Sequence, residues 1–170
     1  MRRRAFTLVE LLVVIAIIGL LSTIAIISTA NARMASRNVR RNADIAQYLK
    51  AFSLANDANG GVYPLVQSCV SVTCGGAWSG VVANAGVDNF FSPYFPNKPT
   101  DPPDAKRTVT GYVYNGAFSG TAPYDGYIYS SVPVVSWFME TPSNITTICG
   151  AGRVWSTTAT QTQCFLILNQ

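Results

Sequence analysis

The 170 residues include no histidine, so the carboxylates and thiols are the side chains that remain as candidates for chemistry. Catalysis by a histidine base and ligation of a metal by histidine are therefore excluded. Neither a nucleophile-elbow nor a Walker-type motif occurs, so we expect that the protein is not an enzyme and binds no cofactor. Asp101, Asp104 and Asp125 lie in turn-rich segments and are weak candidates for a Ca²⁺ site. Their spacing does not match an EF-hand loop, and we favour turn formation.

The four cysteines fall into two local groups, Cys69 with Cys74 and Cys149 with Cys164. Their spacing does not match a standard zinc pattern. Of the three connectivities that four cysteines allow, we favour disulfides within the two local groups, with free thiols as the alternative. Disulfides persist outside the cytoplasm, and the second loop would contribute about 3 kcal/mol and hold the last strand.

Glu10 stands directly before residues 11–32, a run of 22 residues without any charge. Roughly 20 apolar residues suffice to cross a bilayer as a helix, and the arginines at positions 2–4 would keep the N-terminus in the cytoplasm. An ionised side chain at the centre of a membrane helix costs about 2.5–3.5 kcal/mol. The residues leave three interpretations open: a signal peptide cleaved after Ala32, a plain single-span anchor, or a retained helix in which Glu10 has a specific partner.

The sequence from residue 3 to residue 19, RRAFTLVELLVVIAIIG, resembles the class III leader of type IV pilins and type II secretion pseudopilins. The resemblance implies that a prepilin peptidase cuts between Ala5 and Phe6 and then N-methylates Phe6. Glu10 stands at the family's invariant glutamate. The chain departs from the family in two ways: Ala5 replaces the usual glycine, and no proline precedes Pro64, whereas many major pilins carry one in the membrane half.

Cleavage would create a positive amine at Phe6, about one helical turn from Glu10. In a membrane or a fibre core, both charges need compensation. A staggered neighbouring subunit can offer its amine to Glu10, which neutralises both charges and sets the axial register of a filament. An intramolecular pair between Glu10 and its own amine is the alternative in the monomer.

One long helix is expected to carry these groups from Phe6 to about Ala58, because Asn59-Gly60-Gly61 supplies a left-handed C-cap. Such a helix would be about 80 Å long, too long for its own domain to cover. Its second half is amphipathic. We expect one apolar face and one opposite polar face, made respectively of Ala35, Val39, Ala43, Ile45, Ala46, Leu49 and Phe52, and of Ser36, Arg37, Arg40, Arg41, Asp44 and Gln47.

Arginines 33, 37, 40 and 41 follow the apolar run and give the N-terminal part of the chain its basic character. Such a cluster can bind anionic lipid headgroups or DNA. We favour a solvated helix face that marks where the chain leaves the bilayer. The sequence pI of about 9.0 reflects this segment, since residues 51–170 contain more acidic than basic side chains. DNA is therefore not indicated as a partner.

Residues 59–170 are rich in turn residues and contain short β-type runs at 108–114, 126–132, 134–139 and 164–168. Joined by hairpins, these runs predict an antiparallel sheet whose apolar face lies on the amphipathic half of the helix. The expected fold class is therefore α+β, a long N-terminal helix packed on a small antiparallel head.

The expected division of the chain is a leader at 1–5, a membrane and polymerisation half of the helix at 6–32, an amphipathic half at 33–58 and an extracytoplasmic head at 59–170. The resemblance implies a structural subunit of a type IV pilus-like filament, made as a membrane precursor. The alternatives are a pseudopilin of a type II secretion piston and, less favoured, a secreted monomeric binding module.

The implied partners are further copies of the chain, membrane lipid before assembly, the prepilin peptidase, an inner-membrane platform protein and an assembly ATPase. The implied location is a single-pass precursor in the cytoplasmic membrane with its N-terminus in the cytoplasm, and then a cell-surface or periplasmic filament.

Overall fold

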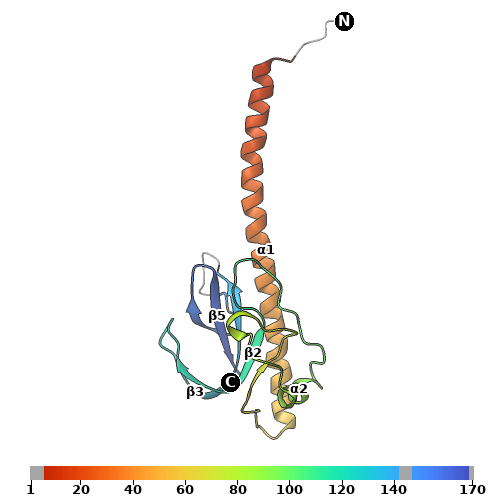
Figure 1. Ribbon diagram of the computed structural model, residues 1–170, viewed down its shortest axis with the longest axis vertical. Coiled ribbons are helices and arrows are strands. Elements are labelled where there is room, and N and C mark those ends of the chain that lie inside the picture. The colour runs from red at the N-terminus through yellow and green to blue at the C-terminus, as the bar shows by residue number, and fades with distance from the viewer. Residues whose placement is uncertain (1–5, 142–146, 169–170) are drawn as a thin grey trace. The chain divides into compact units, whose positions relative to one another are not determined.

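The computed structural model describes residues 6–141 and 147–168, except for the side chains of residues 24–28. The chain forms two compact units, Met1–Ser36 and Arg37–Gln170, and the long helix contributes to both. Figure 1 shows the elements, which are α1 (Leu8–Ala58), β1 (Gln67–Cys69), the 3₁₀ turn η1 (Gly76–Trp78), α2 (Ala85–Phe91), β2 (Tyr112–Thr121), β3 (Ile128–Glu140), β4 (Arg153–Thr157) and β5 (Gln161–Ile167).

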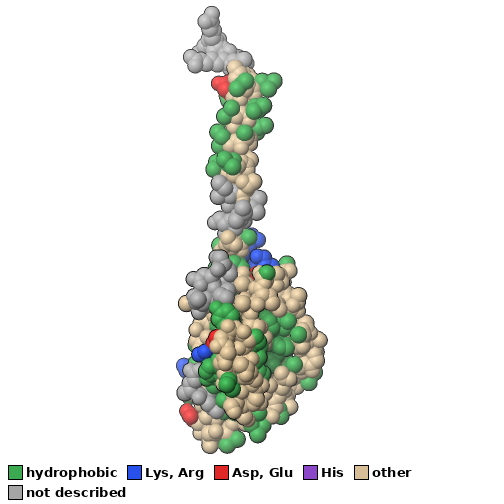
Figure 2. All heavy atoms as spheres, turned by 90° about the vertical axis from the view of Figure 1, so that its left-hand side faces the viewer, with side chains coloured by type: hydrophobic (Ala, Val, Ile, Leu, Met, Phe, Trp, Pro, Cys, Tyr) green, Lys and Arg blue, Asp and Glu red, His purple; other side chains and the backbone are tan. Residues whose placement is uncertain are grey.

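The first unit consists of the N-terminal part of α1. Every side chain from residue 6 to residue 23 is exposed, and most of these side chains are large and apolar. Figure 2 shows apolar side chains along the visible face of this helix. Within the described residues, no helix has the combination of length and apolar character that a membrane crossing requires. This part of α1 is thus a helix whose apolar surface the chain does not cover.

The second unit is built on a five-stranded antiparallel sheet in the order β1-β2-β3-β5-β4. One face of the sheet packs on the second half of α1, as Figure 1 shows. The helix contributes Ile45, Tyr48 and Phe52 to this core, and the ring of Phe52 stacks on Tyr114 of β2 at 4.9 Å between centroids. The predicted α+β architecture, with the sheet lying on the helix, is confirmed.

The strand boundaries differ from those expected. The runs at 126–132 and 134–139 form the single strand β3, and Pro133 lies inside it. A proline is tolerated there because the pairing with β2 is irregular between Asn115 and Phe118. The carbonyl of Pro133 still accepts a hydrogen bond from the N–H of Leu168 at 2.9 Å.

Several elements were not expected from the sequence. Strand β2 begins at Tyr112 rather than Thr108, and β1, β4 and α2 are additional. Asn84 is the residue by which the sequence could have indicated α2. Its side chain accepts hydrogen bonds from the N–H groups of Gly86 and Val87 and so caps the helix.

The predicted end of α1 at Ala58 is confirmed. Gly60 has a φ of 70°, and the N–H of Gly61 donates to the carbonyl of Asn56 at 2.9 Å. Glycine adopts this left-handed conformation without the steric cost of a Cβ atom.

The buried face of α1 was predicted correctly over only part of its length. Ile45 and Phe52 lie in the core and Leu49 packs against it, as expected. Towards the N-terminal end, however, the expected apolar face is exposed, with Val39 at 68%. The side chains buried there instead are polar: Asn38, Arg41 and Asp44. The prediction failed because the head supplies partners for those polar groups, which hydrophobic periodicity cannot reveal.

We expect Phe52→Ala to lower the free energy of unfolding by about 3–5 kcal/mol, because a fully buried ring would leave a cavity beneath Tyr114. Urea unfolding of the disulfide-intact chain, followed by circular dichroism, measures this. The matched control is Leu54→Ala, on the same helix but 43% exposed, which should cost less than about 1 kcal/mol. Equal losses in the two variants would contradict the assigned helix face.

Candidate functional site in the N-terminal segment and the head

The first residues of α1 form a compact hydrogen-bonded cap. The backbone N–H and the hydroxyl of Thr7 both donate to Oε2 of Glu10, each at 2.8 Å. The N–H of Glu10 donates in return to the Thr7 hydroxyl at 3.3 Å. This reciprocal arrangement is a capping box, which satisfies N–H groups that have no partner within the helix. Phe6 lies next to it and is exposed, whereas Ala5 lies outside the described residues.

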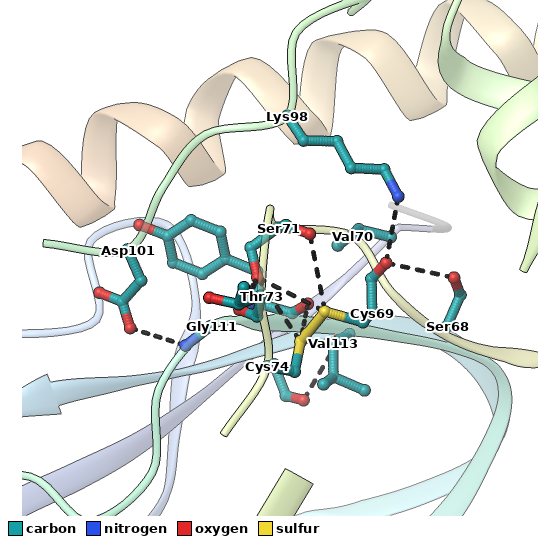
Figure 3. Close-up of a disulfide and its surroundings, with 12 residues drawn as sticks. Ser68, Cys69, Val70, Ser71, Thr73, Cys74, Lys98, Asp101, Gly111 and Val113 are labelled. Atoms are coloured by element: carbon teal, nitrogen blue, oxygen red, sulfur yellow. Dashed lines mark hydrogen bonds between the residues drawn. A yellow bond between two sulfur atoms is a disulfide. The ribbon is translucent and has the colours of Figure 1, made fainter. Parts of the chain in front are cut away.

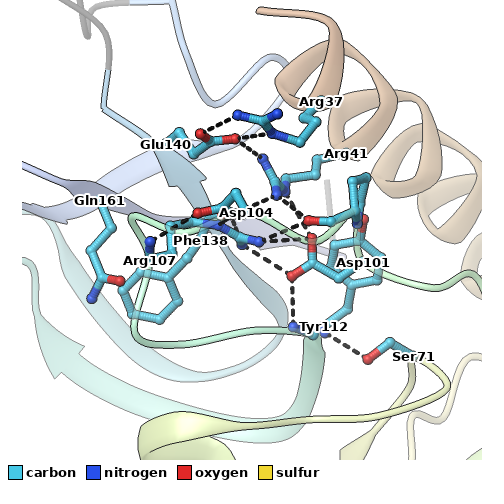
Figure 4. A network of polar contacts seen from close by, with 12 residues as sticks. Arg37, Arg41, Ser71, Asp101, Asp104, Arg107, Tyr112, Phe138, Glu140 and Gln161 are labelled. Carbon is cyan, nitrogen blue, oxygen red and sulfur yellow. Dashed lines mark hydrogen bonds and ion pairs between the residues drawn. The ribbon is translucent and has the colours of Figure 1, made fainter. Parts of the chain in front are cut away.

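A network of ions is buried where α1 meets the head. Its members are Arg37, Arg41, Asp101, Asp104, Arg107 and Glu140, and Figure 4 shows them converging from the helix, the 101–107 loop and the end of β3. We call this set the ionic network. Three guanidinium groups face three carboxylates, so the group as a whole is neutral. Charge balance of this kind is what a buried ion cluster requires.

Arg41 is the centre of the ionic network, and its side chain is fully buried. Its Nε donates to Asp101 at 2.8 Å, while its terminal nitrogens reach Asp104 at 3.0 Å and Glu140 at 3.2 Å. The side-chain oxygen of Asn38 and the carbonyl of Pro102 accept two further hydrogen bonds. A guanidinium has five N–H donors, and all five are used here. A lysine could not replace it.

Arg107 completes the ionic network from the loop side. Its Nε donates to Asp104 at 2.6 Å, and its other nitrogens bind both oxygens of Asp101 and the carbonyls of Pro102 and Phe138. Burial alone would raise the pKa of Asp104, but hydrogen bonds from the backbone and side chain of Arg107 hold that pKa below its usual value. The carboxylate therefore stays ionised as part of the network.

Arg37 and Arg41 correct the expectation of a solvated arginine face. Arg37 forms a bidentate pair with the buried carboxylate of Glu140, with both distances at 2.6 Å. Hydrogen bonding to Glu140 raises the pKa of Arg37. Arg33 and Arg40 are exposed, as expected. The sequence analysis did not identify Glu140 or Arg107, because neither has a distinctive local pattern.

The three calcium candidates are engaged by arginines. Asp101 and Asp104 belong to the ionic network, and Asp125 pairs at 2.7 Å with Arg153 in a different part of the head. The structure therefore does not bring the three together. Among the described residues, no group of three or more acidic or cysteine side chains is placed to hold a metal ion.

A second buried contact joins α1 to β2. The hydroxyl of Tyr112 donates to Oδ2 of Asp44 at 2.8 Å. Burial raises the pKa of Asp44, while the hydrogen bond from Tyr112 and the nearby guanidinium groups of Arg40 and Arg41 act in the opposite direction. The charged form of Asp44 is therefore less stable in the fold than in water.

Both local disulfides are formed, Cys69–Cys74 and Cys149–Cys164. Figure 3 shows the first, which joins Cys69 at the end of β1 to Cys74 in the loop that follows. Ser71 holds this loop to β2, because its hydroxyl accepts the N–H of Tyr112 at 2.9 Å. The second joins the buried Cys149 to Cys164 in β5. The two bridges thus attach irregular segments of the head to its sheet.

We expect Arg41→Met to destabilise the head by about 3–5 kcal/mol, because it leaves three carboxylates with one guanidinium fewer in a buried site. Urea unfolding provides the measurement. The neighbouring Arg40 is exposed, so Arg40→Met is the matched control and should change the free energy of unfolding by no more than about 0.5 kcal/mol. Similar effects for both variants would show that Arg41 does not hold the network.

Asp44 should give the head a distinctive dependence on pH. Because its pKa is raised in the fold, the native state binds its proton more readily than the unfolded state does. Its contribution to stability must therefore increase as the pH falls from neutral towards the ordinary value of 3.8. Asp44→Asn should remove this gain, which unfolding curves between pH 7 and pH 4.5 measure relative to the parent.

The exposed Asp57 of the same helix provides the control, and Asp57→Asn should follow the parent through this pH range. A difference between the parent and Asp44→Asn that does not change with pH would refute the assignment. The pKa of Asp104 in the ionic network is lowered, so this carboxylate titrates below the window.

The comparison with known protein families gives a match for the N-terminal segment and none for the head. Residues 1–26 match a family model described as the prokaryotic N-terminal methylation motif. No curated protein and no solved structure matches the chain. The matched residues include Phe6 and Glu10, the capping box and the start of the uncovered apolar helix. The N-terminal segment therefore carries the prokaryotic N-terminal methylation motif, which is the class III prepilin-type leader of type IV pilins and pseudopilins.

Proposed function

We propose that the chain is a structural subunit of a type IV pilus-like filament, cleaved between Ala5 and Phe6 and assembled through the N-terminal half of α1. The observation that carries this proposal is the methylation motif at residues 1–26 joined to a helix whose apolar side chains the chain leaves uncovered. Such a surface needs a second apolar phase or other copies of the same helix. Lipid would cover it in the precursor and sister subunits in the filament.

In this proposal the chain divides as its sequence indicates, into a leader at 1–5, an assembly helix at 6–32, an amphipathic helix at 33–58 and a head at 59–170. The charge-free run at 11–32 anchors the precursor in the cytoplasmic membrane, and the arginines at positions 2–4 lie on the cytoplasmic side. The proposed partners are the prepilin peptidase, a platform protein, an assembly ATPase and other copies of the chain.

Glu10 has a defined part in the proposed assembly. In the precursor its carboxylate is occupied by Thr7. Cleavage creates a cation at Phe6, and a charged pair within an apolar bundle is far more stable than either charge alone. The amine of an incoming subunit can then compete with Thr7 for the Glu10 carboxylate, because a charge-assisted hydrogen bond is stronger than a neutral one. The pair fixes the axial offset between subunits.

A second candidate function is that of a pseudopilin in a secretion piston. The observation that favours it is the unbroken course of α1 from Leu8 to Ala58, which contains no proline. The two candidates share processing and helix packing, and they differ in whether the filament is exposed on the cell surface.

Intact-mass and N-terminal peptide mass spectrometry of the sheared surface fraction and of membranes tests the proposal. We expect a mature chain that begins at N-methylated Phe6. Glu10→Gln should be processed in the membrane but should be absent from the sheared fraction, because its side chain no longer carries the charge that matches the amine.

Ser22→Ala is the matched control in the same helix, since the Ser22 hydroxyl donates to a carbonyl of its own helix, that of Ile18, at 2.7 Å. It should reach the sheared fraction like the parent. A mature chain that begins at Arg33 would overturn the filament proposal and support a secreted domain. A mature chain that begins at Phe6 but never leaves the cell would favour the pseudopilin.

A further inference from the structure

The outer face of the sheet carries a second cluster of aromatic side chains, away from α1. Side chains alternate along a strand, so Val135 and Leu166 face the helix while Val134, Phe165 and Ile167 face outward. We call the outer cluster the aromatic face; its rings are Phe118, Tyr127, Tyr129, Trp155 and Phe165. These rings support the turn that joins β2 to β3.

The β2–β3 hairpin is bent over this face. Its pairing is interrupted on both sides of Phe118, and interruptions of this kind bend and twist a hairpin. Gly120 lies against Trp155, where an added Cβ atom would be only 3.1 Å from the indole ring. The rigid aromatic face therefore fixes the position of the turn at residues 122–127.

A pocket of about 230 Å³ lies between this turn and the end of β4, lined by Pro123, Tyr124, Ser156 and Thr157. Its volume is below the roughly 300–1,000 Å³ that is typical of sites for drug-sized ligands. A ligand group about the size of one six-membered ring is therefore the appropriate occupant. The Tyr124 side chain is 43% exposed, and among the described residues no other ring or cation packs on it.

The polar groups around the pocket indicate an uncharged ligand that carries hydroxyl groups. Ser156 donates to Gln163 at 3.4 Å, so its oxygen keeps lone pairs that can accept from a ligand. The Thr157 hydroxyl contacts the buried Thr162 hydroxyl at 2.9 Å. The nearby charges cancel, because Arg153 pairs with Asp125 at 2.7 Å and covers the ring of Tyr127 at 4.1 Å. No net charge attracts a phosphate or a nucleic acid.

A peptide strand is a poorer occupant. Although β4 is an edge strand, the carbonyl of Trp155 already accepts the N–H of Tyr124 at 3.1 Å. The turn thus covers the edge at which an added strand would have to pair.

We propose that this pocket binds one neutral sugar residue of a glycan, with the ring of Tyr124 as the stacking face and the Ser156 hydroxyl as a hydrogen-bond acceptor. The C–H groups on one side of a pyranose ring are weakly positive and pack on the negative face of an aromatic ring. The site does not depend on the proposed filament, but a filament would present many copies and so strengthen weak binding by avidity.

Saturation-transfer NMR on the full-length protein tests the proposal, in a detergent that has no sugar headgroup. The probes are the methyl glycosides of glucose, galactose, mannose and N-acetylglucosamine, with a methyl sialoside and a proline-rich peptide for comparison. We expect saturable binding of at least one neutral glycoside. Tyr124→Ala should weaken it about tenfold, whereas Tyr124→Phe should retain it, because the stacking face remains.

Tyr94→Ala is the matched control, because Tyr94 is 41% exposed and does not line the pocket. It should bind like the parent. Ser156→Ala gives an independent variant that keeps the ring and should also bind more weakly. The proposal is overturned if no neutral glycoside binds, if only the sialoside or the peptide binds, or if Tyr94→Ala loses as much affinity as Tyr124→Ala.

Discussion

The attachment of α1 to the head depends on a buried cation, the guanidinium of Arg41. Removing that charge from water is costly, and the cost is offset only because all five of its N–H groups find acceptors. Those acceptors come from the helix, from the 101–107 loop and from the end of β3. One side chain therefore holds three segments that are remote in sequence, and its position fixes the rotation of α1 about its own axis relative to the sheet.

Different interactions therefore surround successive parts of α1. From Ile45 to Phe52 it is held by apolar packing against the sheet, and around Arg41 by ions and hydrogen bonds. From residue 6 to residue 23 it has no cover from the chain itself. Under the filament proposal, this division would let the uncovered part exchange lipid for sister helices while the packing within the head is kept.

The sheet has two faces with different roles. The inner face packs on the second half of α1, and the hydrogen bond from Tyr112 to Asp44 joins the two. The outer face supports the β2–β3 turn on packed rings and leaves Tyr124 exposed in a pocket that Ser156 also lines. The hydrogen bond from the N–H of Tyr124 to the carbonyl of Trp155 and the ion pair of Asp125 with Arg153 hold the same turn.

The sequence by itself determined the features that depend on local pattern: the leader motif, the end of α1 at the Asn59-Gly60-Gly61 cap, the apolar packing of Ile45 and Phe52, and the short disulfide loops. Only the tertiary structure decided the roles of Arg37 and Arg41, because their carboxylates lie 60 or more residues away. Hydrophobic periodicity predicts that a charged residue lies on the solvent-exposed face of a helix. The same residue is buried when the fold brings it opposite charges, and that balance is a property of the assembled head.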